Sequence, residues 1–357
     1  MEIGIAGLPN VGKSTLFNAL TSQNVPADVF PFTTIEPNTG IAAVTDVRLD
    51  KLVEIFKPEK VRRSTIKFVD IAGLVKGAHT GQGLGNKFLS HIRDVNAVLQ
   101  VVRAFKNDRV ANSITGINPR EEIEIIETEM ILSDIEQLNN AREKFQGQAR
   151  CGLKEAKIKS DILQKAYEVL NTGVPLRDAP GLDAQSLSEY NFLTLKKTLY
   201  VFNTDDDAPQ TDPETGRFVR EIKKSDFIMM NVQMEYELNR IDPSERGDFC
   251  REFRYETQIP EMVRMASRLL GLITFYTVVG TEVSAWSVPS GMGVRQAAGK
   301  IHSDMEKGFI KADVYGFSQI EKVGSEKALA EHGLIKTVGK EYAVQDGDII
   351  KIKFQQG

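Results

Sequence analysis

The sequence has few features of secreted or membrane proteins. It contains two cysteines in 357 residues. Two are too few for a disulfide framework or a zinc site, and they predict a reducing, intracellular compartment. No stretch approaches the roughly 18 consecutive apolar residues of a membrane-spanning helix. The first residues also lack the basic and apolar regions of a signal peptide. We therefore expect a cytoplasmic protein with no membrane contact.

An excess of charge of one sign is also missing. The formal net charge is −4, which argues against a polycation that binds nucleic acid over its whole surface. With 41% hydrophobic and 26% charged residues, the composition excludes a disordered or low-complexity chain. A length of 357 residues predicts two or three domains.

Short apolar runs alternate with helical patterns in the first part of the chain and recur later. The runs that we expect to form buried strands are Ile3–Ala6, Ile66–Val69, Ala97–Val102, Thr198–Phe202 and Phe227–Met230. Residues 14–20 have the pattern of a helix. Alternating strands and helices predict the α/β class, in which helices cover both faces of a parallel sheet.

A helical pattern interrupts this sheet. Asn118, Pro119 and Glu121 form a helix start with a capping box, and apolar residues at helical spacing follow. A weak turn at Gln146-Gly147 separates this run from a second one near Ile162. We expect an antiparallel helical hairpin.

The charges of the two helical runs differ. Residues 120–136 contain seven acids and one base, whereas residues 142–165 contain seven bases and three acids. One interpretation is charge complementarity between packed helices with solvated outer faces. The other is a basic face for a polyanion such as RNA.

The last part of the chain is β-rich. From Leu272 onward strands dominate, and residues 342–354 predict two strands around a turn at 346–348. The expected domains are the first part of an α/β domain (1–117), a helical hairpin insertion (118–185), the second part of the α/β domain (186–272) and a C-terminal β domain (273–357).

Residues 7–14, GLPNVGKS, match the pattern G-x-x-x-x-G-K-[ST] between a predicted strand and a predicted helix. In such a P-loop, backbone N–H groups and the helix N-terminus bind phosphate oxygens. Lys13 supplies a positive charge to the β- and γ-phosphates, and the Ser14 hydroxyl binds Mg²⁺. The residues expected to contact the nucleotide here are Asn10, Val11, Gly12, Lys13, Ser14 and Thr15.

Two further segments belong to the same predicted site. Asp70 ends a buried strand and begins D-x-x-G, so its carboxylate is expected to reach the Mg²⁺ and the Gly73 N–H to approach the γ-phosphate. A threonine between the two motifs is expected to be a second Mg²⁺ ligand. Thr33 and Thr34 compete for this role, and we assign it to Thr34.

These motifs resemble those of a known family. GLPNVGKST at 7–15, PFTTIEPN at 31–38 and DIAGLVKGA at 70–78 resemble the Obg-related translation-factor GTPases of the TRAFAC class. HTGQGLGN at 79–86 and QAAGKIHSD at 296–304 narrow the resemblance to the YchF branch, the Obg-like ATPases. The resemblance covers essentially the whole chain. It implies a G-domain interrupted by a helical hairpin, a C-terminal TGS domain with a β-grasp fold, ATP hydrolysis, and association with the ribosome, chiefly its large subunit.

Base recognition departs from the family pattern. The YchF family usually carries N-x-x-E, but this chain has Asn203-Thr204-Asp205-Asp206. Asn203 can offer an amide donor and an acceptor to adenine, whereas Asp206 can accept from guanine N1–H. The lysine of the guanine-reading N-K-x-D is missing, so we expect ATP to bind more tightly than GTP, with Asn203, Thr204 and Asp206 at the base.

The catalytic arrangement differs from that of Ras-like proteins. Leu74 stands where those proteins have the glutamine that orients the attacking water. His79, in a Gly-rich segment, is the nearest side chain able to replace it, and its family counterpart is also His. Positioning by backbone and a bound cation is the alternative. The catalytic residues that we predict are His79, Lys13 and Gly73.

The sequence thus predicts a cytoplasmic, monomeric, Mg²⁺-dependent ATPase that binds the ribosome and acts as a nucleotide-dependent switch in translation or stress response. Its basic helical hairpin is a candidate RNA contact. A GTPase of the same architecture and a nucleotide-binding ribosome or RNA adaptor with negligible turnover are the alternatives.

Overall fold

The computed structural model describes residues 1–21, 38–71, 84–107, 116–150, 154–205, 218 and 226–355. These residues divide into two compact units. The first holds residues 1–21, 38–40 and the described residues between 67 and 258. The second holds residues 41–66 and 259–355. The chain therefore leaves the first unit after residue 40, returns to it at residue 67 and leaves it again after residue 258.

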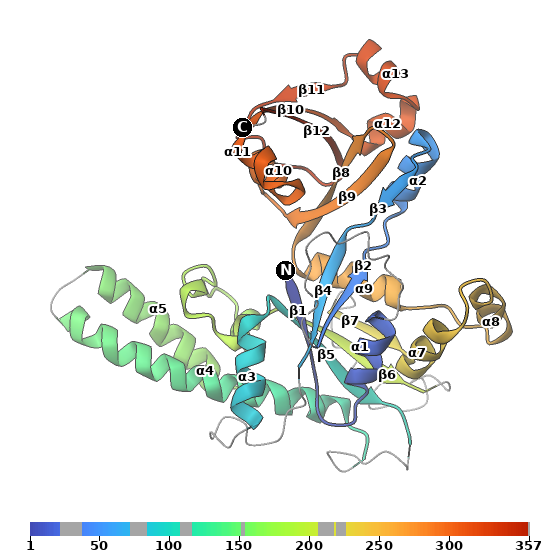
Figure 1. Cartoon of the computed structure of the whole chain (residues 1–357). Helices are drawn as coiled ribbons and strands as arrows, with labels where there is room; N and C mark the ends of the chain where they lie inside the picture. The colour runs from blue at the N-terminus through green and yellow to red at the C-terminus, as the bar shows by residue number, and fades with distance from the viewer. Residues whose placement is uncertain are drawn as a thin grey trace. The chain divides into compact units, whose positions relative to one another are not determined.

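A six-stranded sheet with the order β2-β4-β1-β5-β6-β7 forms the centre of the α/β part (Figure 1). Its strands are β2 (Thr39–Ala43), β4 (Thr65–Asp70), β1 (Glu2–Ala6), β5 (Ala97–Ala104), β6 (Thr198–Thr204) and β7 (Phe227–Met230). Every pairing among β4, β1, β5, β6 and β7 is parallel. The central strands are almost entirely buried, because a parallel sheet is covered on both faces. All five predicted strands and the α/β class are confirmed.

The helices of the first unit are α1 (Lys13–Thr21), α3 (Leu84–Asp94), α4 (Pro119–Arg150), α5 (Lys154–Asn171), α7 (Val232–Arg240) and α8 (Arg246–Glu252), with 3₁₀ turns η3 (Leu176–Asp178), η4 (Ser188–Tyr190) and η5 (Leu193–Leu195). They include the three that the sequence predicts, α1, α4 and α5. The predicted helix start is present, since Asn118 Oδ1 accepts a hydrogen bond from the Glu121 N–H at 3.2 Å. Near this start, Ile123 packs with Val102 and Phe202 of the sheet.

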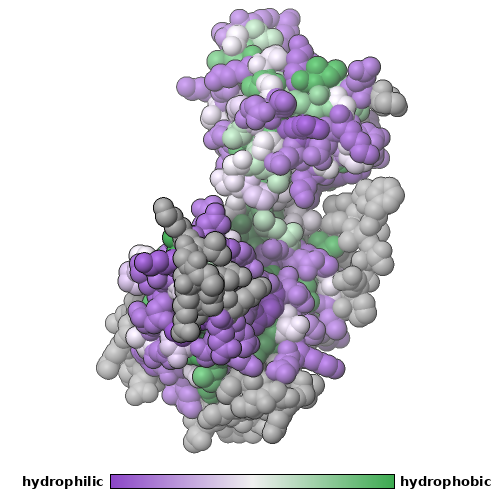
Figure 2. Space-filling model, turned by 90° about the vertical axis from the view of Figure 1, so that its left-hand side faces the viewer, coloured by the Kyte–Doolittle hydropathy of each residue, from purple (hydrophilic) through white to green (hydrophobic). Residues whose placement is uncertain are grey.

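The first helix of the hairpin is longer than the sequence predicts. The turn expected at Gln146-Gly147 is wrong, because α4 continues through both residues to Arg150. One glycine costs about 1 kcal/mol in a helix, and the surrounding Lys, Gln, Ala and Arg residues favour helix enough to outweigh it. Figure 1 shows α4 and α5 side by side, extending away from the sheet. Figure 2 faces the end of this pair and shows mainly hydrophilic side chains around it.

A second six-stranded sheet, β11-β10-β12-β8-β9-β3, forms the other unit. Its elements are β3 (Lys60–Arg62), β8 (Leu272–Val279), β9 (Glu282–Pro289), β10 (Phe309–Gly316), β11 (Lys336–Val338) and β12 (Asp348–Phe354), with helices α2 (Val47–Phe56), α9 (Ile259–Leu269), α10 (Val294–Ile301), α11 (Ser303–Lys307), α12 (Phe317–Val323) and α13 (Glu326–Glu331). The predicted β-rich C-terminal part is confirmed. The first of the two strands expected in 342–354 is absent, because Ala343 makes only an isolated bridge with Gly293.

Residues 44–64, between β2 and β4, lie within the second unit, although the sequence predicts them to belong to the α/β domain. Leu49 and Leu52 of α2 are fully buried in its core beside Tyr276. Strand β3 extends its sheet by pairing parallel to β9. A charged pair, Arg48 with Asp346 at 2.7 Å, adds a contact between α2 and the turn before β12. The α2–β3 segment is therefore an integral part of the C-terminal fold. The boundaries predicted around the helical hairpin stay predictions.

No helix in the described ranges has both the length and the apolar character needed to cross a bilayer.

Candidate functional site

The loop between β1 and α1 makes a sharp turn that depends on two glycines. Gly7 and Gly12 have φ values of +156° and +103°. A Cβ atom at Gly7 would lie 2.6 Å from the Val101 carbonyl oxygen, and one at Gly12 would lie 2.5 Å from Asn203 Nδ2. Any larger residue would therefore strain the loop and displace its neighbours. Because α1 begins at Lys13, the positive end of the helix lies at the cavity that this loop borders.

Lys13 lies in this loop with its side chain largely buried. The side chain is 9% exposed, and Nζ donates a hydrogen bond to the Leu8 carbonyl at 2.6 Å. Burial lowers the pKa of Lys13, while the negative charges of Asp70 and Glu122 act in the opposite direction. An ammonium group that has lost much of its hydration gains strongly from an anionic ligand. Lys13 is thus prepared to bind phosphate.

Ser14 and Asp70 place two oxygen atoms side by side near Lys13. Ser14 Oγ donates to Asp70 Oδ2 at 3.4 Å. Burial raises the pKa of Asp70, and the Lys13 charge and the Ser14 hydrogen bond oppose that rise. In an octahedral Mg²⁺ shell, neighbouring ligand oxygens are about 2.9 Å apart, so this hydroxyl–carboxylate pair fits Mg²⁺ after a small movement. The described ranges hold no cluster of three or more His, Cys, Asp or Glu side chains suited to a metal.

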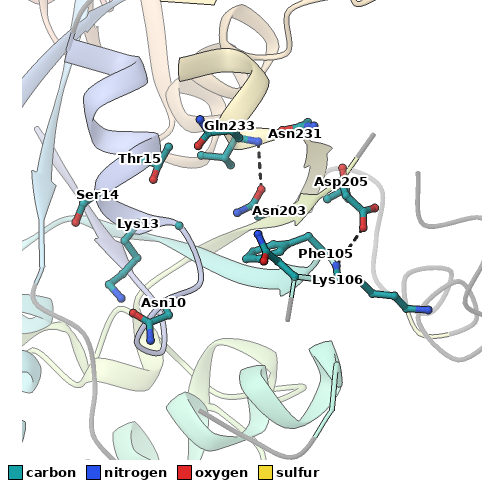
Figure 3. Close-up of a pocket in the computed structure, with 14 residues that line it drawn as sticks. Asn10, Lys13, Ser14, Thr15, Phe105, Lys106, Asn203, Asp205, Asn231 and Gln233 are labelled. Atoms are coloured by element: carbon teal, nitrogen blue, oxygen red, sulfur yellow. Dashed lines mark hydrogen bonds between the residues drawn. The ribbon is translucent and has the colours of Figure 1, made fainter. Parts of the chain in front are cut away.

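Asn203, at the end of β6, joins the P-loop to the start of α7. Its Nδ2 donates to the Val11 carbonyl at 2.9 Å. Its Oδ1 accepts from the Val232 N–H at 3.1 Å, which is one of the dashed lines in Figure 3. Each polar atom of the Asn203 amide thus already has one partner, and a bidentate contact with adenine would use the second lone pair of Oδ1 and the second proton of Nδ2. The second Nδ2 proton can still donate to purine N7, which is an acceptor in adenine and guanine alike.

A cavity of about 580 Å³ extends from Lys13 past Asn203, within the usual size range of ligand pockets. In Figure 3, Asn10, Lys13 and Ser14 lie on one side of Asn203, and Phe105, Lys106 and Asp205 lie on the other. The lining of the cavity also includes three residues from the loop before α7 and the start of that helix, namely Asn231, Val232 and Gln233. The predicted residues Asn10, Gly12, Lys13, Ser14, Thr15, Asn203 and Thr204 all line this cavity.

The wall formed by residues 105–107 is held by two neighbours. Asp205 Oδ2 accepts a hydrogen bond from the Lys106 N–H at 3.0 Å. The Arg103 guanidinium lies 4.4 Å from the centre of the Phe105 ring and donates to the Asn107 carbonyl at 3.1 Å. These contacts give the cavity a preformed wall at the carboxyl ends of β5 and β6, where ligands of parallel sheets bind.

Four predicted residues lie outside the described ranges: Thr34, Gly73, His79 and Asp206. Their roles stay predictions. Sequence reasoning missed Phe105, Lys106 and Asn107, although their place directly after a buried strand is a usable signal. Val232 and Gln233, at the start of α7, also line the cavity, and the Val232 N–H bonds to Asn203.

Family models match both ends of the chain. YchF-GTPase_C, described as a protein of unknown function, matches residues 272–355. MMR_HSR1, described as a 50S ribosome-binding GTPase, matches residues 2–141. The first match falls within the second structural unit, and the other includes the P-loop.

Curated relatives match over nearly their whole length. The Ribosome-binding ATPase YchF of Pasteurella multocida (strain Pm70) is 42% identical over 359 residues, with 99% of each chain covered. The protein of the same name from Bacillus subtilis (strain 168) is 38% identical over 363 residues, again with 99% of each chain covered. The solved structure of the Schizosaccharomyces pombe YchF GTPase is 32% identical with a TM-score of 0.88, covering 99% of this chain and 97% of that one.

The fold and the site together define a P-loop nucleotide-binding protein. A parallel sheet, a glycine-dependent loop at the start of a helix, a buried lysine and a serine–aspartate pair are its characteristic parts. The similarity over the full length places the protein more narrowly: the chain belongs to the YchF family.

Proposed function

We propose that this chain is a ribosome-binding ATPase that hydrolyses ATP to ADP and phosphate as a nucleotide-dependent switch. The observation that supports it most is the meeting of Lys13, Ser14 and Asp70 at the N-terminus of α1, in a chain whose full-length relatives are named ribosome-binding ATPases. Because ribosomes are the proposed partner, the proposed location is the cytoplasm. Monomeric action and a place among the Obg-related TRAFAC proteins belong to the same proposal.

In this proposal Mg²⁺ is held by Ser14, Asp70 and Thr34. When bound, Mg²⁺ would supply positive charge that offsets the negative charge of the phosphates and of the transition state. Lys13 and the α1 N-terminus bind the phosphates, and the Gly73 N–H approaches the γ-phosphate. His79 orients the attacking water in place of the glutamine of Ras-like proteins.

Ser14→Ala tests the metal role. The variant is expected to weaken ATP binding about 10- to 100-fold in the presence of Mg²⁺, because an oxygen ligand beside a charged group is lost. Binding in excess EDTA should change much less. The measurement is titration of ATP with and without Mg²⁺, with Thr21→Ala at the far end of α1 as the control. Equal losses under both conditions would contradict the metal role.

Two other functions stay open. A GTPase of the same architecture is favoured by the S. pombe relative, which is named a YchF GTPase. Parallel titration with ATP and GTP separates it from an ATPase. A nucleotide-binding adaptor is the other alternative, and steady-state turnover with a Lys13 variant as the blank would test it.

The α4–α5 pair is proposed as an RNA contact on the ribosome, chiefly on its large subunit. Lys157 is exposed on α5, whereas Lys159 bonds to Glu189 at 2.8 Å. Glu127 of α4 pairs with Arg177 beyond α5. Both ion pairs join the hairpin to the segment that follows it. These charged residues of α4 and α5 therefore pair with that segment and not with each other.

Reversing the charges of Lys154, Lys157 and Lys159 to Glu tests this contact. Ribosome co-sedimentation is expected to weaken, and the slope of its logarithmic salt dependence should decrease by up to about 3, because each lost phosphate contact removes slightly less than one unit. Reversal of Lys322, Lys327 and Lys340 in the second unit gives the same change in net charge as a control. If co-sedimentation is unaltered at every salt concentration, the basic residues of the hairpin form only a solvated face and do not contact the ribosome.

A further inference from the structure

Glu122 is a buried carboxyl group that the proposed chemistry does not use. It belongs to the first turn of α4 and is 4% exposed. Its Oε2 accepts a hydrogen bond from the Arg103 N–H at 2.9 Å, which fixes it to the end of β5. Its charge and that of Lys13 stabilise each other, so Glu122 lies within electrostatic reach of the P-loop.

The groups that act on Glu122 come from three elements. Burial raises the pKa of Glu122 to about 7, and this is the dominant effect on it. The Arg103 backbone hydrogen bond, the Arg103 guanidinium on β5 and the Lys13 ammonium on α1 lower its pKa, and the neighbouring carboxylate Glu121 on α4 raises it. Glu122 is therefore placed to change its protonation state near neutral pH.

Nucleotide phosphates would bring several negative charges to Lys13. The surroundings of Glu122 exclude most water, so these charges are poorly screened from its carboxylate. We propose that Glu122 takes up a proton from solvent when a nucleotide occupies the P-loop, which converts phosphate binding into the loss of a charge at the start of the helical hairpin. This inference rests on the proposed function only in requiring that a nucleotide binds there.

Protonation changes the first turn of α4 in two ways. A neutral carboxyl is a weaker acceptor for the Arg103 N–H than a carboxylate. It also loses the favourable interaction of a negative charge with the positive N-terminal end of α4. Since α4 runs from Pro119 to Arg150 without interruption, the proton transfer occurs at the base of the element that is proposed to contact RNA.

Calorimetry measures the proton directly. ATP with Mg²⁺ is titrated into the full chain at pH 7 in two buffers with different ionisation enthalpies, and the difference in binding enthalpy gives the number of protons taken up. A carboxyl with a pKa near 7 is about half ionised, so the wild type is expected to take up about 0.5 proton more than Glu122→Gln. Protons that belong to ATP itself contribute equally in both chains. Glu124→Gln removes a charge from the exposed side of α4 and should behave as the wild type.

The pH dependence of affinity has a definite sign. The proton affinity of Glu122 is higher with nucleotide bound, so ATP affinity falls as pH rises between the pKa of the free and the bound state. From pH 6 to pH 8 the wild type should weaken about three- to tenfold more than Glu122→Gln. Proton uptake or a pH profile unchanged by Glu122→Gln would overturn the proposal.

A spectroscopic measurement does not depend on the variant. The infrared difference spectrum of the wild-type chain should gain a band of protonated carboxyl when ATP binds at pH 7.5, and a spectrum without this band would also overturn the proposal. Failure of the proposed function looks different, because then the wild type would show no saturable ATP binding in the same calorimeter.

Discussion

Lys13→Met is expected to weaken ATP binding by about 100-fold or more and to abolish turnover. In its proposed role Lys13 donates charge-assisted hydrogen bonds to phosphate, and each such bond contributes about 1.5–3 kcal/mol. Its ammonium is already largely buried at the cavity, so little further desolvation opposes phosphate binding. Affinity is measured by titration with a fluorescent nucleotide, and turnover by phosphate release.

The same substitution should leave the fold intact. Methionine keeps the apolar stem and removes an ammonium whose burial is costly, but it also removes the positive charge that faces Asp70 and Glu122. These effects oppose each other, so the free energy of unfolding should change by no more than about 1 kcal/mol. Lys165→Met, on the exposed side of α5, is a matched control for charge. A folded Lys13→Met chain with unchanged ATP affinity would refute the P-loop interpretation.

Elements that depend on local pattern could be predicted from the sequence. The buried strands β1, β4, β5, β6 and β7 are short apolar runs, and α4 begins at a capping box that needs only neighbouring residues. The α2–β3 segment could not be placed, because Leu49 and Leu52 are buried against residues more than two hundred positions away, such as Tyr276. An amphipathic helix shows that it buries one face, but the sequence does not show which core receives it.

In the candidate site, too, the residues that belong to a local motif could be predicted and those that depend on distant contacts could not. The P-loop is a contiguous motif, so the place of Lys13 and Ser14 at the cavity could be predicted, while their roles stay predictions. Residues 105–107 reach the cavity through contacts with Arg103 and Asp205, which no motif describes. The position of Asn203 at the site could be predicted. The partners of its amide lie in the P-loop and at the start of α7, which only the folded chain brings together.

Asn203→Ala is expected to weaken ATP and GTP binding by a similar factor, on the order of 100-fold. The substitution leaves the Val11 carbonyl and the Val232 N–H without their partner, and each buried unpaired group costs about 1–3 kcal/mol. Both the P-loop and the start of α7 lose the connection that holds them at the cavity. The loss of these two hydrogen bonds weakens binding whichever base the nucleotide carries. The lost Nδ2 donor to N7 also serves both purines.

The bidentate hypothesis makes a different prediction for the same variant. If Asn203 reads the adenine 6-amino group through its oxygen, Asn203→Ala loses ATP affinity selectively and the ratio of ATP to GTP affinity collapses. Competition of ATP and GTP for one fluorescent nucleotide, in wild type and variant, gives that ratio. Asn231→Ala is the control, since Asn231 lines the same cavity but caps α7 by accepting from the Met234 N–H at 2.9 Å. The other outcome is a constant ratio of ATP to GTP affinity in the Asn203 variant while both affinities and its melting temperature fall. That result would mean that Asn203 holds the site together and that other residues at the base end of the cavity select the nucleotide.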